Sequence, residues 1–444
     1  MMSPPLMGLA SFVILLLLLA LRMPIGVAML AVGSAGFIAI DGLPRYLSFL
    51  NETPYETLAN PSFSVIPLFL LMGSLATVSG LSARLFQGAD ALVGHFRGGL
   101  AMAAVLSCAA FGTICGSSLA TAATMGQVAL PEMRKVGYSG ALSTGVLAAG
   151  GTLGILVPPS VPLVIYAILT EQNVAKLFLA AFIPAGIAIA GFLAAIAVTV
   201  RLKPDWAPAG HAPKPFSERT AAVLATWPVV AIFAVVFIGM NGSFFFGHSL
   251  FTPTEGASIG AALTGIAAIW IGGSRWPQIK GALLQTAEQS GMIFLILLGA
   301  EVYNAFLART HLTNQAAALF GSGAANPMLV IVGIVAIYIL LGCLMDSLSM
   351  ILLTVPVLFP VVMALPLGMP PEEVAIWFGI LSLVVVELGL IHPPVGLNVF
   401  VIHSIAKDVP MLETFKGVVP FLISEFGRVA LLIAFPALSL WLTR

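Results

Sequence analysis

Long apolar stretches separated by short polar segments recur along the whole chain and restrict what it can fold into. A helix needs about 20 consecutive, mostly apolar residues to cross the hydrocarbon core of a bilayer. Hydrophobic residues make up 59% of the 444 residues and charged residues only 8%, whereas soluble domains carry about 25% charged residues. The chain is therefore predicted to be an all-α polytopic membrane protein that is embedded in membrane lipid.

Charge and cysteine content exclude several classes of protein. The formal net charge is zero, which leaves no basic field to hold nucleic acid. Cys108, Cys115 and Cys343 all lie in apolar stretches, so neither a disulfide framework nor a CxxC metal site is indicated. The sequence contains no GxxxxGK[ST] or HExxH motif. We expect a protein that is not an enzyme and uses no cofactor beyond a coupling ion.

The apolar stretches divide into single spans and two longer segments. The segments 98–134 and 328–366 are too long for one helix and are interrupted at polar, glycine-bearing centres, so each is predicted to be a re-entrant hairpin. Three segments that mix charged and apolar residues are predicted to lie along the membrane surface: 43–58, 276–287 and 408–417. Full spans are predicted near 5–21, 24–41, 63–81, 139–169, 177–200, 220–241, 255–273, 288–308, 373–403 and 418–442.

The basic residues predict an orientation. Arg22 directly follows the first apolar run and no lysine or arginine precedes it, which is typical of a retained helix rather than a signal peptide. If the polar segment 201–219 is cytoplasmic, thirteen of the 18 lysines and arginines fall inside and four outside, as the positive-inside rule requires. Both termini are then predicted to be periplasmic, in a bacterial cytoplasmic (inner) membrane.

The two halves of the chain repeat the same motifs. Gly112-x3-Gly116-Ser117 in the first half matches Gly342-x3-Asp346-Ser347 in the second. We predict a first repeat over 1–200, a cytoplasmic linker over 201–219 and a second repeat over 220–444. Each half has five spans and one hairpin, and this odd number of crossings inverts the second copy, as in many transporters. Each repeat also contains a predicted broken helix, at 139–169 and 373–403.

Four polar breaks carry the strongest local signal, at 112–118, 150–160, 342–347 and 387–394. Unpaired backbone is costly in hydrocarbon unless protein or water satisfies it. For one break, a kink satisfied by neighbouring helices is the simpler interpretation, but four breaks in related pairs indicate a binding centre. Free carbonyls and hydroxyls suit a small cation, and the N-termini of half-helices suit an anion.

Ionisable residues inside apolar stretches are functional candidates. Asp346 at the second hairpin tip is predicted to be a cation ligand or an organiser of the tip. Glu387 either belongs to a ligand shell or makes a structural hydrogen bond. His392 either meets substrate or is a buried neutral histidine, and the second alternative is favoured. Glu425 and Arg428, at positions i and i+3, are predicted to form a structural ion pair.

At these breaks the sequence resembles the large membrane subunit of tripartite ATP-independent periplasmic transporters, over essentially its whole length. The resemblance is carried by Cys115–Gly126 (CGSSLATAATMG), Ala149–Ser160 (AGGTLGILVPPS), Asp346 with Leu353–Pro356 (LTVP), and Glu387–Asn398 (ELGLIHPPVGLN).

The resemblance implies an elevator-type transporter with a fixed scaffold domain and a mobile transport domain. It implies sodium-coupled import of an organic acid, usually a carboxylate. It also implies two protein partners, a small four-helix membrane subunit and a soluble periplasmic substrate-binding protein.

The resemblance also assigns site residues, with one sodium site at the first pair of breaks, another at the second pair, and substrate between the two tips. The implied sodium-binding residues are Gly116, Ser117, Ser118, Gly150, Gly151, Thr152, Gly342, Asp346, Ser347, Glu387 and Pro393. The implied substrate-binding residues are Cys115, Ser117, Thr121, Pro159, Asp346, His392 and Asn398.

Three alternatives remain open. One is a stand-alone sodium/carboxylate symporter of similar design that needs no binding protein. Another is an intramembrane hydrolase that uses Ser117 or Ser118 with His392. The third is a scaffold or channel without ion coupling. The residues leave open which acid is carried and how many sodium ions accompany it.

Overall fold

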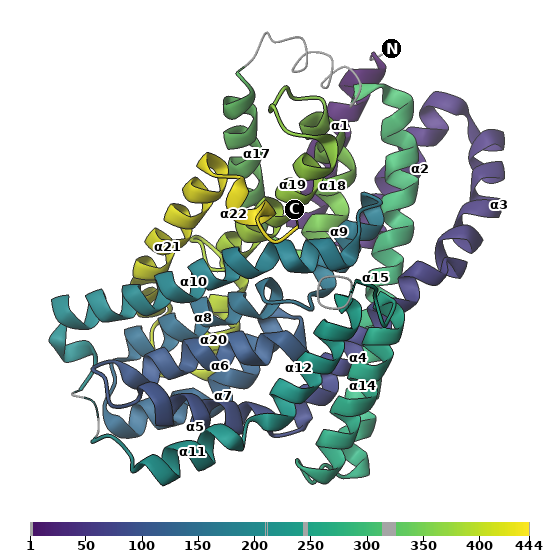
Figure 1. Cartoon of the computed structure of the whole chain (residues 1–444). Helices are drawn as coiled ribbons and strands as arrows, with labels where there is room; N and C mark the ends of the chain where they lie inside the picture. Colours follow the sequence, from purple (N-terminus) through teal and green to yellow (C-terminus); the bar gives the residue numbers. More distant parts are fainter. Residues whose placement is uncertain (1–2, 209, 211, 243–246, 313–325, 444) are drawn as a thin grey trace.

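The chain folds into helices throughout the part that the structure describes. The computed structural model describes residues 3–208, 210, 212–242, 247–312 and 326–443. Within these ranges there is no β-strand, which confirms the predicted all-α class (Figure 1). In chain order the α-helices are α1 (Pro4–Ala20), α2 (Ile25–Asp41), α3 (Leu43–Ala59), α4 (Val65–Val78), α5 (Leu81–Val93), α6 (Gly99–Cys115), α7 (Ser118–Val136), α8 (Gly140–Leu156), α9 (Val161–Leu169), α10 (Val174–Leu202), α11 (Phe216–Leu224), α12 (Trp227–Met240), α14 (Pro253–Trp270), α15 (Trp276–Thr310), α17 (Pro327–Gly342), α18 (Ser347–Met363), α19 (Pro371–Gly389), α20 (Leu397–Ile405), α21 (Met411–Ala434) and α22 (Ala437–Leu440).

The first half contains a helical hairpin followed by a broken helix. Helices α6 and α7 pack against each other and are joined by only Gly116 and Ser117. Helices α8 and α9 are separated by residues 157–160, and their axes differ by 43°. Helix α8 packs against both α6 and α7, so the break lies close to the hairpin tip.

The second half places the same elements in the same order. Helices α17 and α18 pack together and are joined by residues 343–346, and α19 is separated from α20 by residues 390–396. Helix α19 packs against both members of this hairpin. The Pro158–Pro159 and Pro393–Pro394 peptide bonds, one in each break, are both cis.

In each half the hairpin crosses the broken helix at a pair of glycines. A Cβ atom placed on Gly112 would lie 2.7 Å from the Cα of Gly154, and one placed on Gly342 would lie 2.9 Å from the Cα of Gly389. Real Cβ atoms do not approach a backbone this closely, because dense packing leaves no room for the overlap. Both crossings therefore require glycine, at positions that match between the repeated motifs.

Two segments predicted as separate surface helices are continuous with their neighbours. Residues 276–287 and the expected span 288–308 form the single helix α15, whose 35 residues extend about 52 Å. Residues 411–417 of the segment predicted at 408–417 likewise continue into the next span, as part of α21. A change in hydropathy marks where lipid contact is expected to end, but backbone hydrogen bonding can continue past it. The helix boundaries predicted from hydropathy were therefore wrong at these two places. The segment predicted at 43–58 is the separate helix α3.

Fewer helices than the ten predicted spans reach 18 residues with an apolar composition. Four helices in the described residues are long and apolar enough to cross a membrane, and up to six if each of two bent pairs counts as one span. Helices α1 and α2 have 17 residues each, at the short end of the range for spanning helices. The predicted linker 201–219 is also partly helical, because α11 begins at Phe216 and meets α12 at an angle of 44°.

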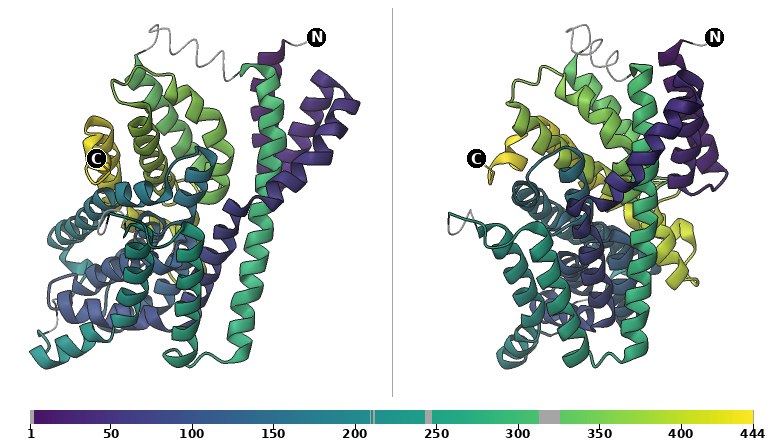
Figure 2. Two further views of the ribbon diagram at one scale, coloured as in Figure 1. Left: turned by 45° about the vertical axis from the view of Figure 1, so that its right-hand side comes forward. Right: turned by 90° about the vertical axis from the view of Figure 1, so that its right-hand side faces the viewer.

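The helices form two groups that meet along α4 and α15. Helix α15 runs the length of the molecule with α2 packed along it and α1 beside them, and α4 packs against α15 and α14 (Figure 2). The hairpins and broken helices form the other group, joined by α10 and α21. Contacts of α4 with α6 and of α15 with α18 connect the groups. The chain ends, whose side of the membrane was predicted, include residues outside the described ranges.

Candidate functional site

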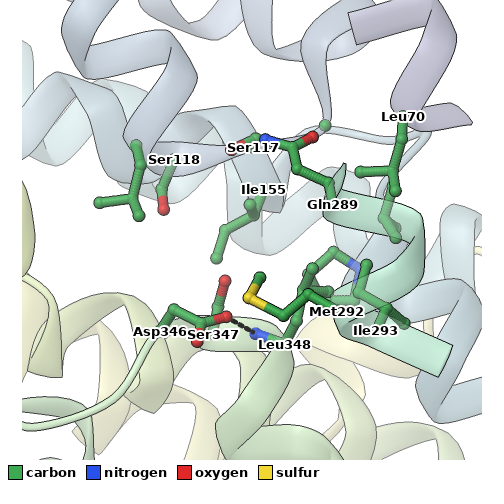
Figure 3. Close-up of a pocket in the computed structure, with 14 residues that line it drawn as sticks. Leu70, Ser117, Ser118, Ile155, Gln289, Met292, Ile293, Asp346, Ser347 and Leu348 are labelled. Carbon is green, nitrogen blue, oxygen red and sulfur yellow. Dashed lines mark hydrogen bonds between the residues drawn. The ribbon is translucent and has the colours of Figure 1, made fainter. Parts of the chain in front are cut away.

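A cavity of about 280 Å³ lies where the two hairpin tips approach α4 and α15. Figure 3 shows Ser117 and Ser118 on one side of it and Asp346 and Ser347 on the other, with side chains of α15 closing one flank. The structure thus brings together residues separated by more than 200 positions in the sequence. The lining residues are Leu70, Gly116, Ser117, Ser118, Leu119, Ile155, Val161, Pro162, Gln289, Met292, Ile293, Asp346, Ser347 and Leu348.

The first tip is built by a glycine and a serine cap. Gly116 ends α6 in the left-handed region, at φ 63°, which only glycine adopts freely. Ser117 then caps α7, because its hydroxyl accepts a hydrogen bond from the backbone N–H of Ala120 at 3.4 Å. The tip is therefore a short turn whose hydroxyl and backbone groups face the cavity.

The second tip is organised by Asp346, as one of its two predicted roles requires. Its Oδ2 accepts hydrogen bonds from the N–H groups of Leu348 at 3.1 Å and Ser349 at 3.2 Å, and its Oδ1 accepts one from the Ser349 hydroxyl. An acidic N-cap is favourable beside the positive end of a helix. Ser117 and Asp346 are each the N-cap of the second helix of their hairpin. The cap follows the crossing glycine by five residues in the first hairpin and by four in the second, so the predicted match of Ser117 with Ser347 is off by one residue, whereas Gly112 and Gly342 still match.

Three helix N-termini contribute to the cavity wall. The first residues of α7, α9 and α18 all line it, together with the carboxylate of Asp346 and the hydroxyls of the two tips. Helix N-termini favour anions, whereas carboxylate, hydroxyl and carbonyl oxygens are the ligands of hard cations. The cavity can therefore accommodate an anion and a small cation next to each other.

Several other predicted residues lie behind the first tip and do not line the cavity. Thr121 and Asn398 are fully buried, and Asn398 Nδ2 donates a hydrogen bond to the carbonyl of Ala148 in α8 at 3.1 Å. Thr121 Oγ1 and Asn398 Oδ1 have no hydrogen-bond partner among the described residues. The remaining members of this buried layer are Cys115, Gly150, Gly151, Thr152 and Pro159.

The rest of the predicted set surrounds the second break. His392 is half-buried, in contrast to the favoured expectation of a buried histidine, and its Nδ1 lies 3.8 Å from Cys343 Sγ. Pro393 is exposed, and Gly342 is buried at its crossing with Gly389. His392 does not line the cavity that contains Ser117 and Ser118, so this cavity does not bring His392 together with either serine, as a hydrolase would require.

Glu387 belongs to a buried ion cluster rather than to the cavity wall. Arg428 Nη2 donates a hydrogen bond to Glu387 Oε2 at 2.9 Å and also bonds to Glu425. This confirms the predicted pair of Glu425 and Arg428 and adds a second carboxylate to it. The three side chains are 0%, 1% and 2% exposed for Glu387, Glu425 and Arg428. The arginine thus connects α21 to the C-terminal end of α19, just before the second break.

Sequence reasoning missed the contribution of the long helix α15 to the cavity. Gln289 and Met292 of this helix line it, as does Leu70 of α4. A signal for Gln289 existed, because it stands in the polar part of a largely apolar helix. The polarity of this part of α15 does not by itself show which of its polar residues faces the two hairpin tips.

Comparison with known proteins gives consistent results. The family model described as "Tripartite ATP-independent periplasmic transporter, DctM component" matches residues 12–438. The C4-dicarboxylate TRAP transporter large permease protein DctM of Pseudomonas aeruginosa is 31% identical over 387 residues, covering 87% of each chain. The sialic acid TRAP transporter large permease protein SiaM of Vibrio cholerae is 29% identical over 437 residues, covering 96% of each chain. In fold, the crystal structure of the YdaH transporter of Alcanivorax borkumensis is similar with a TM-score of 0.56, at 16% identity and 89% coverage of both chains.

Proposed function

Since the chain belongs to the DctM family of tripartite ATP-independent periplasmic transporters, we propose that it imports an organic acid by sodium symport. The observation that carries the proposal is the single cavity that both hairpin tips share. Its oxygen ligands suit sodium and its three helix N-termini suit a carboxylate. A cavity of this kind allows the ion and the acid to bind together.

The proposed sodium sites follow the two tips. One involves Gly116, Ser117 and Ser118 with the adjacent part of α8, and the other involves Asp346 and Ser347 with the second break. Supporting this, the tip oxygens line the cavity, and two oxygens in the buried layer behind the first tip, Thr121 Oγ1 and Asn398 Oδ1, lack partners in the described chain. The carboxylate of the substrate would lie between the tips.

The electrical work of transport explains why sodium is needed. Moving one elementary charge across 100 mV corresponds to about 2.3 kcal/mol. Importing a dicarboxylate against a negative interior therefore costs about twice that amount, and two sodium ions would cancel it. The sodium concentration gradient would then drive uptake, and a monocarboxylate with two sodium ions would also gain from the potential.

The proposed mechanism and partners are those of a tripartite importer. The hairpins and broken helices would move as a transport domain against a scaffold that includes α2, α4 and α15. A small membrane subunit would support the scaffold and a periplasmic binding protein would deliver the acid. A carboxylate substrate is supported by the names of the two permeases, which specify C4-dicarboxylate and sialic acid.

Uptake into proteoliposomes tests this function. The chain, reconstituted with its small subunit, is offered a panel of organic acids with sodium or potassium outside, with and without the binding protein. We expect uptake of one class of carboxylate that requires both sodium and the binding protein. Uptake with sodium alone would instead identify a stand-alone symporter, and uptake that is indifferent to sodium would contradict the proposed ion sites.

Asp346→Asn is expected to raise the sodium concentration for half-maximal uptake by about tenfold, the effect of losing one charge-assisted contact. Asparagine caps a helix about as well as aspartate, so the tip should keep its structure. The matched control is Asp408→Asn, which removes a carboxylate that is 65% exposed and paired with Arg134.

Ser117→Ala is expected to weaken sodium activation in the same way. It also removes a helix cap, which costs about 1 kcal/mol. Ser139→Ala is the control for that loss, because Ser139 caps α8 with a 3.2 Å bond from the N–H of Leu142 and does not line the cavity. Unchanged sodium activation in both Asp346→Asn and Ser117→Ala would rule out the assignment of the tips as sodium sites.

A further inference from the structure

A second cavity, of about 350 Å³, lies on the other side of the second hairpin tip. It shares Asp346 and Met292 with the central cavity, so these two residues form the wall between the two spaces. The opposite wall is the turn between α1 and α2, which includes Arg22. A ligand that leaves or enters the central cavity past the second tip would therefore meet Arg22.

Arg22 lines this cavity with a charge that has no acidic partner in the described part of the chain. The side chain is exposed, and the ion pairs found among the described residues do not include it. Asp346, the carboxylate on the facing wall, is already bonded to the N-terminus of its own helix. The guanidinium thus remains available for an anion from outside the chain.

The other walls of the second cavity are mainly apolar. They come from the α1–α2 turn, from α15, from the second tip and from the start of α20, and include Leu19, Ile25, Leu295, Ile296, Leu344 and Leu397. Ligand sites with apolar walls and one fixed charge orient amphipathic small molecules. A guanidinium binds a carboxylate through two parallel hydrogen bonds, so the chemistry of this cavity matches an organic acid with a hydrocarbon body.

We propose that Arg22 holds the carboxylate of the transported acid in this second cavity, as a binding site separate from the one between the tips. The proposal rests on the proposed function, because it takes the ligand to be the transported acid. The acid would pass between the second cavity, where Arg22 binds its carboxylate, and the central cavity, where helix N-termini bind it. The hairpin tip that carries Asp346 lies between the two cavities. The α1–α2 turn thereby acts in substrate recognition as well as in the scaffold.

Two other roles for Arg22 make different predictions. As a charge at the end of α1, it would stabilise the helix terminus or its orientation, and its loss would reduce the amount of folded protein without changing affinity for the acid. As a partner of Asp346 in another conformation, it would restrain the tip, and its loss would allow sodium-independent exchange. An anion site predicts a change in affinity for the acid itself.

Ligand-induced thermal stabilisation of the purified protein separates these roles without relying on transport. Succinate and hexanoate, which carry carboxylate groups on a hydrocarbon body, are the probes, and butane-1,4-diol is the neutral control, each with sodium or potassium. We expect one carboxylate to stabilise the wild-type protein, and Arg22→Gln to require about tenfold more of it for the same stabilisation. Arg22→Lys should recover part of the affinity, because the charge remains but the paired geometry is lost.

Arg45→Gln is the matched control, since Arg45 is an exposed arginine, 76% accessible, whose 3.6 Å pair with Asp41 lies away from both cavities. It should leave the concentration dependence unchanged. Equal behaviour of Arg22→Gln and wild type, or no stabilisation of the wild type by either carboxylate, would overturn the anion site. Absence of sodium-dependent uptake by the wild-type protein in proteoliposomes would instead contradict the proposed function. Failure of the anion site and failure of the proposed function are therefore seen in different measurements.

Discussion

Replacing Arg428 by methionine is expected to destabilise the protein by about 3–5 kcal/mol, the cost of removing one partner from a buried ion pair. The substitution leaves the carboxylates of Glu387 and Glu425 buried without their shared cation, and both are at most 1% exposed. We expect a large fall in the amount of folded protein and in its melting temperature, measured in detergent on purified protein.

The control for Arg428→Met is a pair that solvent already reaches. Lys176→Met breaks the ion pair with Glu372, in which the side chains are 41% and 57% exposed, and exposed pairs contribute about 0–1 kcal/mol. Combining Arg428→Met with Glu387→Gln and Glu425→Gln should restore much of the lost stability, because no uncompensated charge remains. A single mutant as stable as wild type would mean that the cluster does not hold α19 and α21 together.

Gly342→Ala is expected to abolish most transport, because the added methyl group would lie 2.9 Å from the Cα of Gly389. Neither backbone can withdraw as a flexible side chain could, so α17 must separate from α19. Such overpacking costs about 1–3 kcal/mol, and here it also displaces the tip that carries Asp346. Gly112→Ala should have the same effect in the first half, where the new methyl group would meet Gly154 Cα at 2.7 Å.

The matched control for both glycine variants is Gly333→Ala on α17, where an added Cβ would have nothing within 4 Å. Alanine is favoured over glycine within helices by about 1 kcal/mol, so this control should be neutral or slightly more stable. Initial uptake rates and melting temperatures, measured for all three variants, distinguish crowding from helix propensity. Equal uptake by Gly342→Ala and Gly333→Ala would contradict the requirement for a close crossing.

Local signals in the sequence were sufficient for the class of fold. Apolar length predicts helices in lipid, since their backbone groups must be satisfied internally. The hairpin turns also depend on neighbouring residues only, as the glycine at 116 and the caps at Ser117 and Asp346 illustrate. The helices and the hairpin turns can therefore be predicted without knowing which segments pack against them.

Helix boundaries within polar segments were less predictable. The charged residues before 288 suggested that a surface helix ends there, but α15 continues through them. Backbone hydrogen bonding can continue from lipid into water without interruption, so a change of hydropathy does not require a change of structure.

Partners between distant segments came from tertiary packing alone. The sequence identified Glu387 as a candidate ligand, yet its position on α19 faces Arg428 of α21. The cavity likewise depends on α15 passing both tips, which brings Gln289 next to them, and the second cavity depends on the α1–α2 turn lying opposite Asp346. Periodicity and composition describe one segment at a time, whereas the face that each helix presents to another is set by how all of them pack together.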